Sequence, residues 1–216
     1  MDMISDYGAA VTSGLCQRDV VLPAAPGTAR IAVVADTHSR PDPRAIEFLA
    51  AWRPDVLLHA GDIGDLAVLD RLAPLAPSMH VVRGNIDDER SGIPEMLVLR
   101  LLRPPPEGTA EPEGTAREVL RILLLHIAVA GPKLRKEARA AAMLHHVDMV
   151  VCGHSHVPFV SREGRLTVFN PGSIGPRRFA LPIALGCFEL AERLVVRHID
   201  CETGAVWKPP SHAPLS

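Results

Sequence analysis

Five short apolar runs in this chain each end at residue types that bind metal ions. A short apolar run bounded in this way is typical of a strand that is buried inside an α/β protein. Ligands of open α/β sheets gather beyond the carboxyl ends of the strands. We therefore expect the polar residues behind the five runs to meet at one edge of the fold. The runs are IAVVADTH, VLLHAGD, HVVRGN, ILLLH and VVCGHSH, and their polar residues are Asp36, His38, Asp62, Asn85, His126, His154 and His156.

The spacing within these runs favours a shared pocket. Asp36 and His38 lie two residues apart at the end of an extended segment, so both side chains point the same way. His154 and His156 have the same spacing, and two histidines placed in this way can face one metal ion. The carboxylate of Asp62 can bridge two cations, which an imidazole cannot do. Seven nitrogen and oxygen donors are enough for two ions.

Each of these residues also has a plainer explanation when it is taken alone. Asp36 can cap a turn or a helix, and the Gly84-Asn85 pair is common in turns. A lone histidine such as His126, at the end of an Ile/Leu run, is more often a core residue than a ligand. We interpret His59, on the second run, as a packed residue or as one that supports a ligand. The plain explanations do not predict that every ligand type falls at a strand end, so the joint pattern favours a metal site.

The donor set limits the metal. Oxygen and nitrogen donors without sulfur favour Mn, Fe, Zn, Ni or Mg over a soft metal. The cysteines are scattered and form no C-x-x-C motif. They fit the reduced thiols of a cytoplasmic protein better than disulfides or a thiolate metal site. They are Cys16, Cys152, Cys187 and Cys201.

Composition disfavours several other classes of function. The net charge is −2 with neutral histidines, which gives no basic surface for bulk nucleic acid or an anionic membrane. No apolar stretch reaches the roughly 18 residues of a transmembrane helix. Asp2 and Asp6 stand where a signal peptide would carry positive charge. We therefore expect a cytoplasmic protein.

The order of elements predicts the architecture. Helices are expected over residues 42–53, 65–75 and 133–146, with Asp42 as the N-cap and Pro43 in the first position of the first helix. Parallel βα units come first and antiparallel strands last, which predicts two mixed sheets packed together with helices outside. We expect an N-terminal extension over 1–29 and one domain over 30–206, with a mobile Pro/Gly-rich loop at 103–118. Residues 207–216 are expected to form a C-terminal tail.

The ordered motifs resemble those of the calcineurin-like metallophosphoesterase superfamily, and specifically its small bacterial and archaeal phosphodiesterase branch. The resemblance spans Ile31 to Asp200, and the run Asn170-Pro171-Gly172-Ser173 adds to it. It implies a four-layer αββα sandwich and a small phosphate-ester substrate. Relatives of this kind often self-associate, which leaves a homo-oligomer open.

Carried over position by position, the resemblance implies a dinuclear site. The first metal would bind Asp36, His38, Asp62 and His156, and the second Asp62, Asn85, His126 and His154. Asp62 and Asn85 would have catalytic roles, and manganese is the favoured ion, with Fe, Zn, Ni or Mg as alternatives. Two ions in such a site activate a bridging water, which attacks the phosphate ester.

The sequence departs from the family pattern at two positions. Ile86 stands where many relatives carry a histidine that serves the leaving group, although the branch often lacks it and Asp87 fits the G-N-x-D pattern of that branch. Ile127 stands where relatives often have glycine, which puts the size of the substrate in question. Without the histidine we favour phosphodiesters over alkyl monoesters. Arg177 and Arg178 are candidates for binding the substrate phosphate, or are simply a solvated surface pair.

The sequence leaves two other functions open. The first is a non-catalytic scaffold that binds protein partners, as the retromer subunit of this fold does after losing part of its metal set. The full set of ligand types in this chain favours an enzyme instead. The second is a nuclease, but nucleases among these relatives generally carry extra domains and basic surface.

Overall fold

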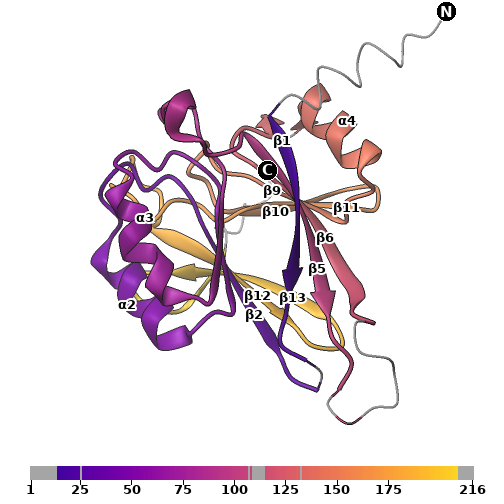
Figure 1. The fold of residues 1–216 in the computed structure, drawn as a ribbon. Coiled ribbons are helices and arrows are strands. Elements are labelled where there is room, and N and C mark those ends of the chain that lie inside the picture. Colours follow the sequence, from indigo (N-terminus) through magenta and orange to yellow (C-terminus); the bar gives the residue numbers. More distant parts are fainter. Residues whose placement is uncertain (1–13, 25, 107, 109–114, 132, 209–216) are drawn as a thin grey trace, which may run out of the picture.

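The computed structural model describes residues 14–24, 26–106, 108, 115–131 and 133–208. These residues form two six-stranded mixed sheets and a small hairpin (Figure 1). The two-sheet α/β architecture expected from the order of elements is confirmed. Residues 107 and 109–114 of the expected 103–118 loop lie outside the described residues, and Arg103 and Arg117 near its two ends belong to strands. Most of the expected 207–216 tail also lies outside the described residues. No described helix is long and apolar enough to cross a bilayer.

The first sheet carries the three parallel strands that lead into the loops of Asp36, Asp62 and Asn85. These strands, β2, β3 and β4, lie side by side, and the C-terminal strands pair antiparallel beyond β2. Its strands in spatial order are β14 (Val206–Trp207), β13 (Leu194–Asp200), β12 (Ala184–Leu190), β2 (Ala29–Val34), β3 (Val56–His59) and β4 (Ser78–Val81).

The second sheet carries the two parallel strands that lead to His126 and to the His154–His156 turn. These strands, β6 and β9, are hydrogen-bonded neighbours in its middle. Its strands in spatial order are β1 (Leu15–Val21), β5 (Met96–Arg103), β6 (Arg117–Leu125), β9 (Met149–Val151), β11 (Leu166–Asn170) and β10 (Phe159–Glu163).

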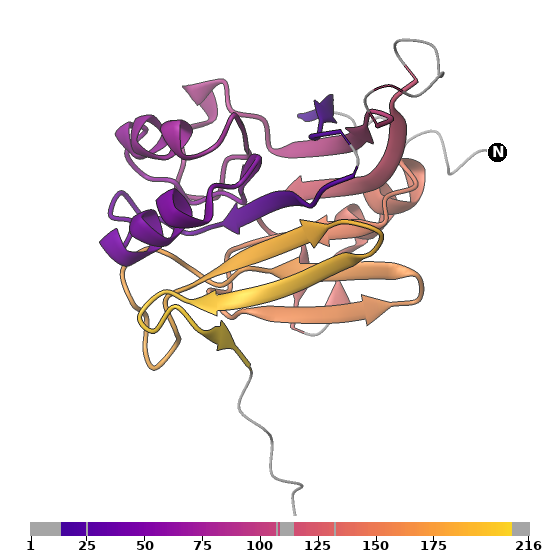
Figure 2. The ribbon, with the colours of Figure 1, turned by 90° about the horizontal axis from the view of Figure 1, so that it is seen from below.

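Helices cover the outer faces of the two sheets (Figure 2). Helices α2 (Pro43–Trp52) and α3 (Ala67–Leu72) pack on the first sheet, and α4 (Lys136–Leu144) packs on the second. A third apolar cluster lies between the sheets. The chain therefore stacks as helix, sheet, sheet and helix. Short elements complete it: η1 (Ala73–Leu75), η2 (Glu89–Ser91), β7 (Val129–Ala130) and β8 (Lys133–Leu134).

Strand β2 shows why the apolar runs are nearly continuous. Ile31 and Val33 belong to the cluster between the sheets, whereas Ala32 and Val34 belong to the cluster beneath α2 and α3. Side chains alternate between the two faces of a strand, so a strand covered on both faces must be apolar at every position.

Helix α2 begins and ends as its sequence predicts. The Asp42 side chain accepts a hydrogen bond from the backbone N–H of Arg44, and Pro43 occupies the first turn. Arg53 ends the helix in the left-handed conformation, directly before Pro54. The helix therefore carries its own start and stop signals.

The structure differs from the sequence-based expectation in two places. Residues Leu15–Val21, for which no strand was expected within the 1–29 extension, form β1, which pairs in parallel with β5. Five of its seven residues are exposed, so no apolar periodicity marks the strand. The helix expected over 133–146 begins only at Lys136, because Lys133 and Leu134 pair with β7.

Candidate metal centre

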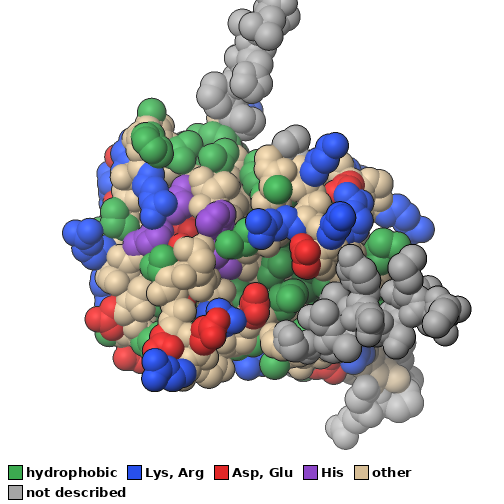
Figure 3. All heavy atoms as spheres, turned by 90° about the horizontal axis from the view of Figure 1, so that it is seen from above, with side chains coloured by type: hydrophobic (Ala, Val, Ile, Leu, Met, Phe, Trp, Pro, Cys, Tyr) green, Lys and Arg blue, Asp and Glu red, His purple; other side chains and the backbone are tan. Residues whose placement is uncertain are grey.

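The seven ligand-type residues of the apolar runs come together at one edge of the molecule. Three of the runs belong to one sheet and two to the other, and both sets of parallel strands end at this edge. Figure 3 shows the result on the surface, where histidine side chains gather around acidic ones. The side chains form two clusters, which Asp62 joins.

The first cluster, cluster one, contains Asp36, His38 and His156, whose donor atoms all lie within 4.8 Å of one another. Nε2 of His156 is 3.3 Å from Oδ1 of Asp36 and 3.2 Å from Nε2 of His38. Burial lowers the pKa of His38, so the ring is neutral near pH 7 and has a lone pair to offer. These three side chains can hold one cation together.

The second cluster, cluster two, contains Asp62, His126 and His154, again within 4.8 Å of one another. Oδ1 of Asn85 lies 3.1 Å from Nε2 of His126 and 2.9 Å from Nδ1 of His154. Oδ1 of Asp62 is also 3.1 Å from Nε2 of His126. Asn85 thus adds a neutral oxygen to the cluster.

Asp62 lies between the two clusters. Its Oδ1 faces His126 in cluster two, and its Oδ2 is 3.8 Å from Nε2 of His38 in cluster one. The two oxygens of one carboxylate therefore point to different clusters. This is the arrangement that a carboxylate bridging two cations requires.

The electrostatics of His126 show that this donor set fits a divalent cation. Its Nδ1–H donates to the carbonyl of Ala60 at 2.8 Å, which leaves Nε2 facing the oxygens of Asp62 and Asn85. Burial lowers the pKa of His126, but the hydrogen bond to Asp62 and the charges of Asp36 and Asp62 outweigh it and raise the pKa. The carboxylates of Asp36 and Asp62 therefore favour positive charge at this position. Oxygen and imidazole donors in this setting suit Mn, Fe, Zn, Ni or Mg.

Cluster one points the same way. Oδ1 of Asp36 is buried and has no hydrogen-bond partner among the described residues. A buried carboxylate oxygen without a partner costs free energy unless a cation satisfies it. Its other oxygen accepts the backbone N–H of His154 at 3.0 Å and so ties the two ligand turns together.

Most of the ligand residues hold a strained backbone. Five of the seven are non-glycine residues with positive φ: Asp36 at 54°, His38 at 44°, Asp62 at 54°, His154 at 69° and His156 at 58°. Such a conformation costs on the order of 1 kcal/mol or more for each residue, and it persists only where the surroundings enforce it. Glycines allow the close approach: a Cβ at Gly84 would collide with Asp62, and one at Gly175 with the Asp36 carbonyl.

The Asn170–Ser173 turn is part of that enforcement. Nδ2 of Asn170 donates to the Gly153 carbonyl at 2.6 Å and to Oγ of Ser155 at 3.2 Å. Oγ of Ser173 donates to the Asp36 carbonyl at 3.0 Å. The turn therefore holds both ligand turns of cluster one. The sequence showed this motif but gave no reason for it.

Asp87 is a supporting residue whose function the sequence did not reveal. Its buried carboxylate accepts three backbone N–H groups, from Ile63, Gly64 and Gly84, at 2.7–3.1 Å. It thereby fixes the loop after Asp62 to the loop before Asn85. The one sequence signal for this supporting function was the position of Asp87 two residues after Asn85.

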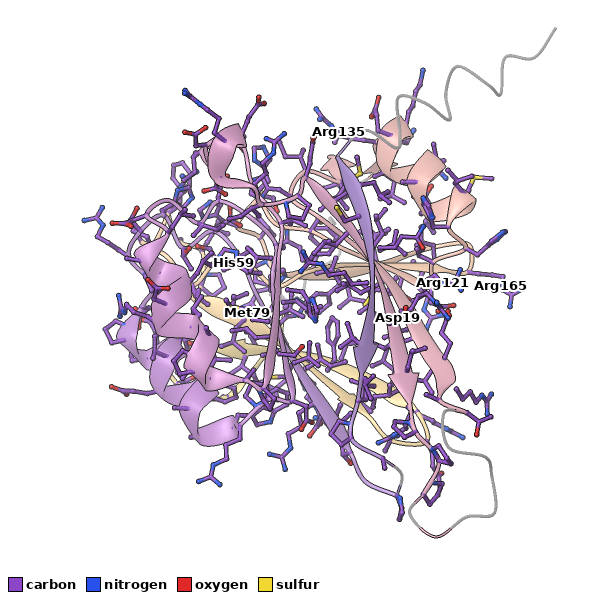
Figure 4. All side chains as sticks on the ribbon, in the orientation of Figure 1. Asp19, His59, Met79, Arg121, Arg135 and Arg165 are labelled. Atoms are coloured by element: carbon purple, nitrogen blue, oxygen red, sulfur yellow. The ribbon has the colours of Figure 1, made fainter. Side chains whose placement is uncertain are left out.

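His59 supports the centre from behind and is not one of its ligands. It is fully buried, and Figure 4 shows it inside the fold on the side that carries α2 and α3. Its Nδ1 accepts the backbone N–H of Gly61 at 3.2 Å, so its Nε2–H is free to donate to Oγ1 of Thr37 at 3.1 Å. Burial lowers its pKa to about 4. This neutral ring links the Asp36 turn to the Asp62 turn.

The two candidate phosphate-binding arginines have different surroundings. Arg178 lies at the edge of the centre, with Nη2 3.2 Å from Nε2 of His38. Arg177 instead pairs with Glu202, which also pairs with Arg44. Only Arg178 is in contact with a ligand-type residue.

Comparison with known proteins places this chain in a family. The sequence profile of the calcineurin-like phosphoesterase superfamily domain matches residues 30–193. A probable metallophosphoesterase of Methanocaldococcus jannaschii is 29% identical over 153 residues, which are 68% of this chain and 69% of that protein. Phosphodiesterase YfcE of Escherichia coli K12 is 29% identical over 122 residues, 56% of this chain and 58% of its own length.

Solved structures show the same fold. Vps29 of Entamoeba histolytica, solved with zinc, superposes with a TM-score of 0.61 at 23% identity and covers 82% of this chain and 96% of its own. YfcE from E. coli superposes with a TM-score of 0.52 at 22% identity, covering 83% and 97%. The match of the sequence profile to most of the chain confirms the resemblance found from the motifs. The chain belongs to the calcineurin-like phosphoesterase superfamily.

Proposed function

We propose that the chain is a dinuclear metal-dependent phosphodiesterase. The first ion would be held by cluster one with Asp62, and the second by cluster two with Asp62 and Asn85. The observation that carries this proposal is the placement of Asp62, whose two oxygens face different clusters. Manganese is our favoured ion, because all the donors are oxygen or nitrogen.

Two bound ions supply a water that is deprotonated near neutral pH and charge that stabilises the reacting phosphoryl group. The residues of the chain do the rest. Asp62 and Asn85 hold the donor atoms that set where the phosphate meets the centre. Arg178, beside His38, offers a guanidinium group to a phosphoryl oxygen.

The isoleucine directly after Asn85 favours diesters. Ile86 follows Asn85 and is 47% exposed at the surface, so an apolar side chain stands where many relatives carry a histidine. It has no proton to give to a leaving group. A diester also brings one negative charge to the centre, whereas a monoester brings up to two.

Metal content and turnover test the proposal directly. The protein is loaded with Mn²⁺, its metal equivalents are counted, and its hydrolysis of bis(p-nitrophenyl) phosphate and p-nitrophenyl phosphate is compared. We expect two equivalents per chain and a higher kcat/KM for the diester. A clear preference for the monoester would overturn the diesterase assignment. Loading with Zn²⁺, Ni²⁺, Fe²⁺ or Mg²⁺ shows which ion gives the highest turnover.

A protein-binding scaffold is the second candidate function. The observation that favours it is exposed apolar surface directly after residues of the centre. Ile86 follows Asn85, Val157 follows His156 and Phe179 follows Arg178, and the three are 47%, 41% and 94% exposed. Exposed apolar groups of this kind often mark interaction sites. The two candidates separate in the same experiment, because a scaffold without metal equivalents would hydrolyse neither ester.

The four cysteines are free thiols, so we place either function in the reducing cytoplasm.

A further inference from the structure

A hollow of about 450 Å³ opens beside cluster two. His154 forms part of its wall, so the hollow and the candidate metal centre share a side chain. We call it the 127–159 groove. Its lining is Ile127, Ala128, Val129, Gly131, Gly153, His154, Ser155, Val157 and Phe159.

The groove is continuous with the centre for a reason that lies in the chain. Ile127 directly follows His126, and Val157 directly follows His156. The residues that follow His126 and His156 in the chain therefore line the groove, together with the Gly153–Ser155 turn. A phosphate held at cluster two would therefore place one of its ester groups at the mouth of the groove.

The lining is apolar. Apart from His154, it contains no ionisable side chain among the described residues. Val157 is 41% exposed, and Ile127 and Phe159 are half-buried, so these side chains expose apolar surface that a ligand can cover. Burying apolar surface is favourable in proportion to its area. A charged or strongly hydrated group would lose its water here without gaining a partner.

The groove continues away from the centre along the edge strand β10. A second hollow of about 470 Å³ shares Val129, Gly131 and Phe159 with it. The charged residues in the lining of this second hollow are Lys133, Arg162 and Glu163. The space available is therefore longer than a methyl or ethyl ester needs. Ile127 matters here, because it adds apolar wall where relatives often have glycine.

We infer that the 127–159 groove binds an apolar ester group of the substrate, an alkyl chain or an aromatic ring of about six carbons or more. This inference rests on the proposed function, because it takes the phosphate to lie at the candidate metal centre. It narrows the substrate to phosphodiesters with at least one apolar ester group.

The test measures binding of three simple diesters that differ in one group only. Dimethyl phosphate, methyl hexyl phosphate and methyl phenyl phosphate compete with bis(p-nitrophenyl) phosphate on the Mn-loaded protein. We expect the inhibition constants of the hexyl and phenyl esters to be at least about tenfold lower than that of dimethyl phosphate, since each buried methylene is worth about a factor of four. The hexyl and phenyl compounds together show whether the groove prefers a chain or a ring. Equal inhibition constants for all three would overturn the inference.

Matched variants locate the effect. Val157 in the groove and Val195 on β13 are 41% and 40% exposed. Val157→Ser and Ile127→Ala should each reduce the ratio between dimethyl and hexyl inhibition constants at least about threefold. Val195→Ser should keep it. An unchanged ratio in both groove variants would place the apolar group elsewhere.

The design separates this inference from the proposed function. If bis(p-nitrophenyl) phosphate is not hydrolysed, the phosphodiesterase proposal fails. Calorimetric titration of the Mn-loaded protein with the same three diesters then still decides the groove. Tighter binding of the hexyl and phenyl esters supports it, and equal or undetectable binding overturns it.

Discussion

The two halves of the candidate metal centre differ in how firmly they are enclosed. In cluster one, Asp36 and His156 are 0% and 2% exposed, and the Asn170–Ser173 turn holds both of their turns. In cluster two, His154 and Asn85 are exposed and border the groove and Ile86. A preorganised site loses less entropy when it binds an ion. Under the proposed function, we expect cluster one to bind its ion more tightly, and we expect solvent and substrate to enter at cluster two.

The largest expected effect is that of replacing Asp62, which should weaken ion binding in both clusters at once. Asp62→Asn removes the carboxylate whose two oxygens face different clusters, so the binding of both ions should weaken. Turnover should fall by at least ~1000-fold, well beyond the ~10–100-fold cost of losing a hydrogen bond that orients a ligand. Metal equivalents and kcat on bis(p-nitrophenyl) phosphate measure this. Asp70→Asn, an exposed residue on α3, is the control. Retention of one full equivalent would show that Asp62 serves a single ion.

Single histidine variants should separate the two halves. His156→Ala removes a buried ligand of cluster one and should abolish the tight binding step, with an affinity loss of more than ~100-fold. His154→Ala should remove only the weaker step, because it acts on cluster two. Titration calorimetry with Mn²⁺ resolves the steps. If both variants lose the same step, the enclosure of cluster one does not set the order of affinity.

The pH dependence of stability tests the packing of His59 behind the metal centre. The pKa of His59 is about 4 in the fold, against about 6.5 in an unfolded chain. Below pH 6.5 the unfolded state therefore binds more protons, so stability falls as the pH falls from 7 toward 4. Between pH 7 and pH 5 this residue should account for about 2 kcal/mol of lost unfolding free energy.

Urea unfolding of the metal-free protein at the two pH values gives this loss. The variant His59→Gln should show a pH dependence shallower by that amount, whatever its stability at pH 7. Parallel pH curves for the two proteins would mean that His59 is not held neutral by burial.

The smallest expected effect is a loss of ion affinity in cluster one alone. Ser173→Ala removes the hydroxyl that donates to the Asp36 carbonyl. We expect the affinity for the tightly bound ion to fall by ~10–100-fold, with the weaker step unchanged. Ser161→Ala, on the exposed part of β10, is the control. An equal loss in both steps would contradict the division into a closed and an open half.

The sequence was most informative where one local signal decided the structure. The apolar runs of β2 and β3 are buried on both faces, so composition alone marks them as strands. Asp42 and Pro43 likewise mark the start of α2. The gathering of the ligand-type residues followed from parallel strands ending at one edge.

Features that depend on tertiary partners were not readable in this way. Strand β1 exists because its backbone pairs with β5, and its side chains carry no pattern. Asp87 gains its function from amides of two other loops. Arg177 and Arg178 are identical neighbours in the sequence, and only the fold gives one of them Glu202 and the other His38.

Strand β1 also changes what the second sheet presents to other molecules. It lies outside the segment that matches the family profile, and it pairs with β5 along all seven of its residues. The amide and carbonyl groups of β5 that would face solvent are thereby capped by the chain's own flank. The new border carries Gln17, Arg18 and Asp19, all exposed. Charged edge strands resist the addition of foreign strands, so we expect β1 to disfavour edge-to-edge association on that side of the sheet.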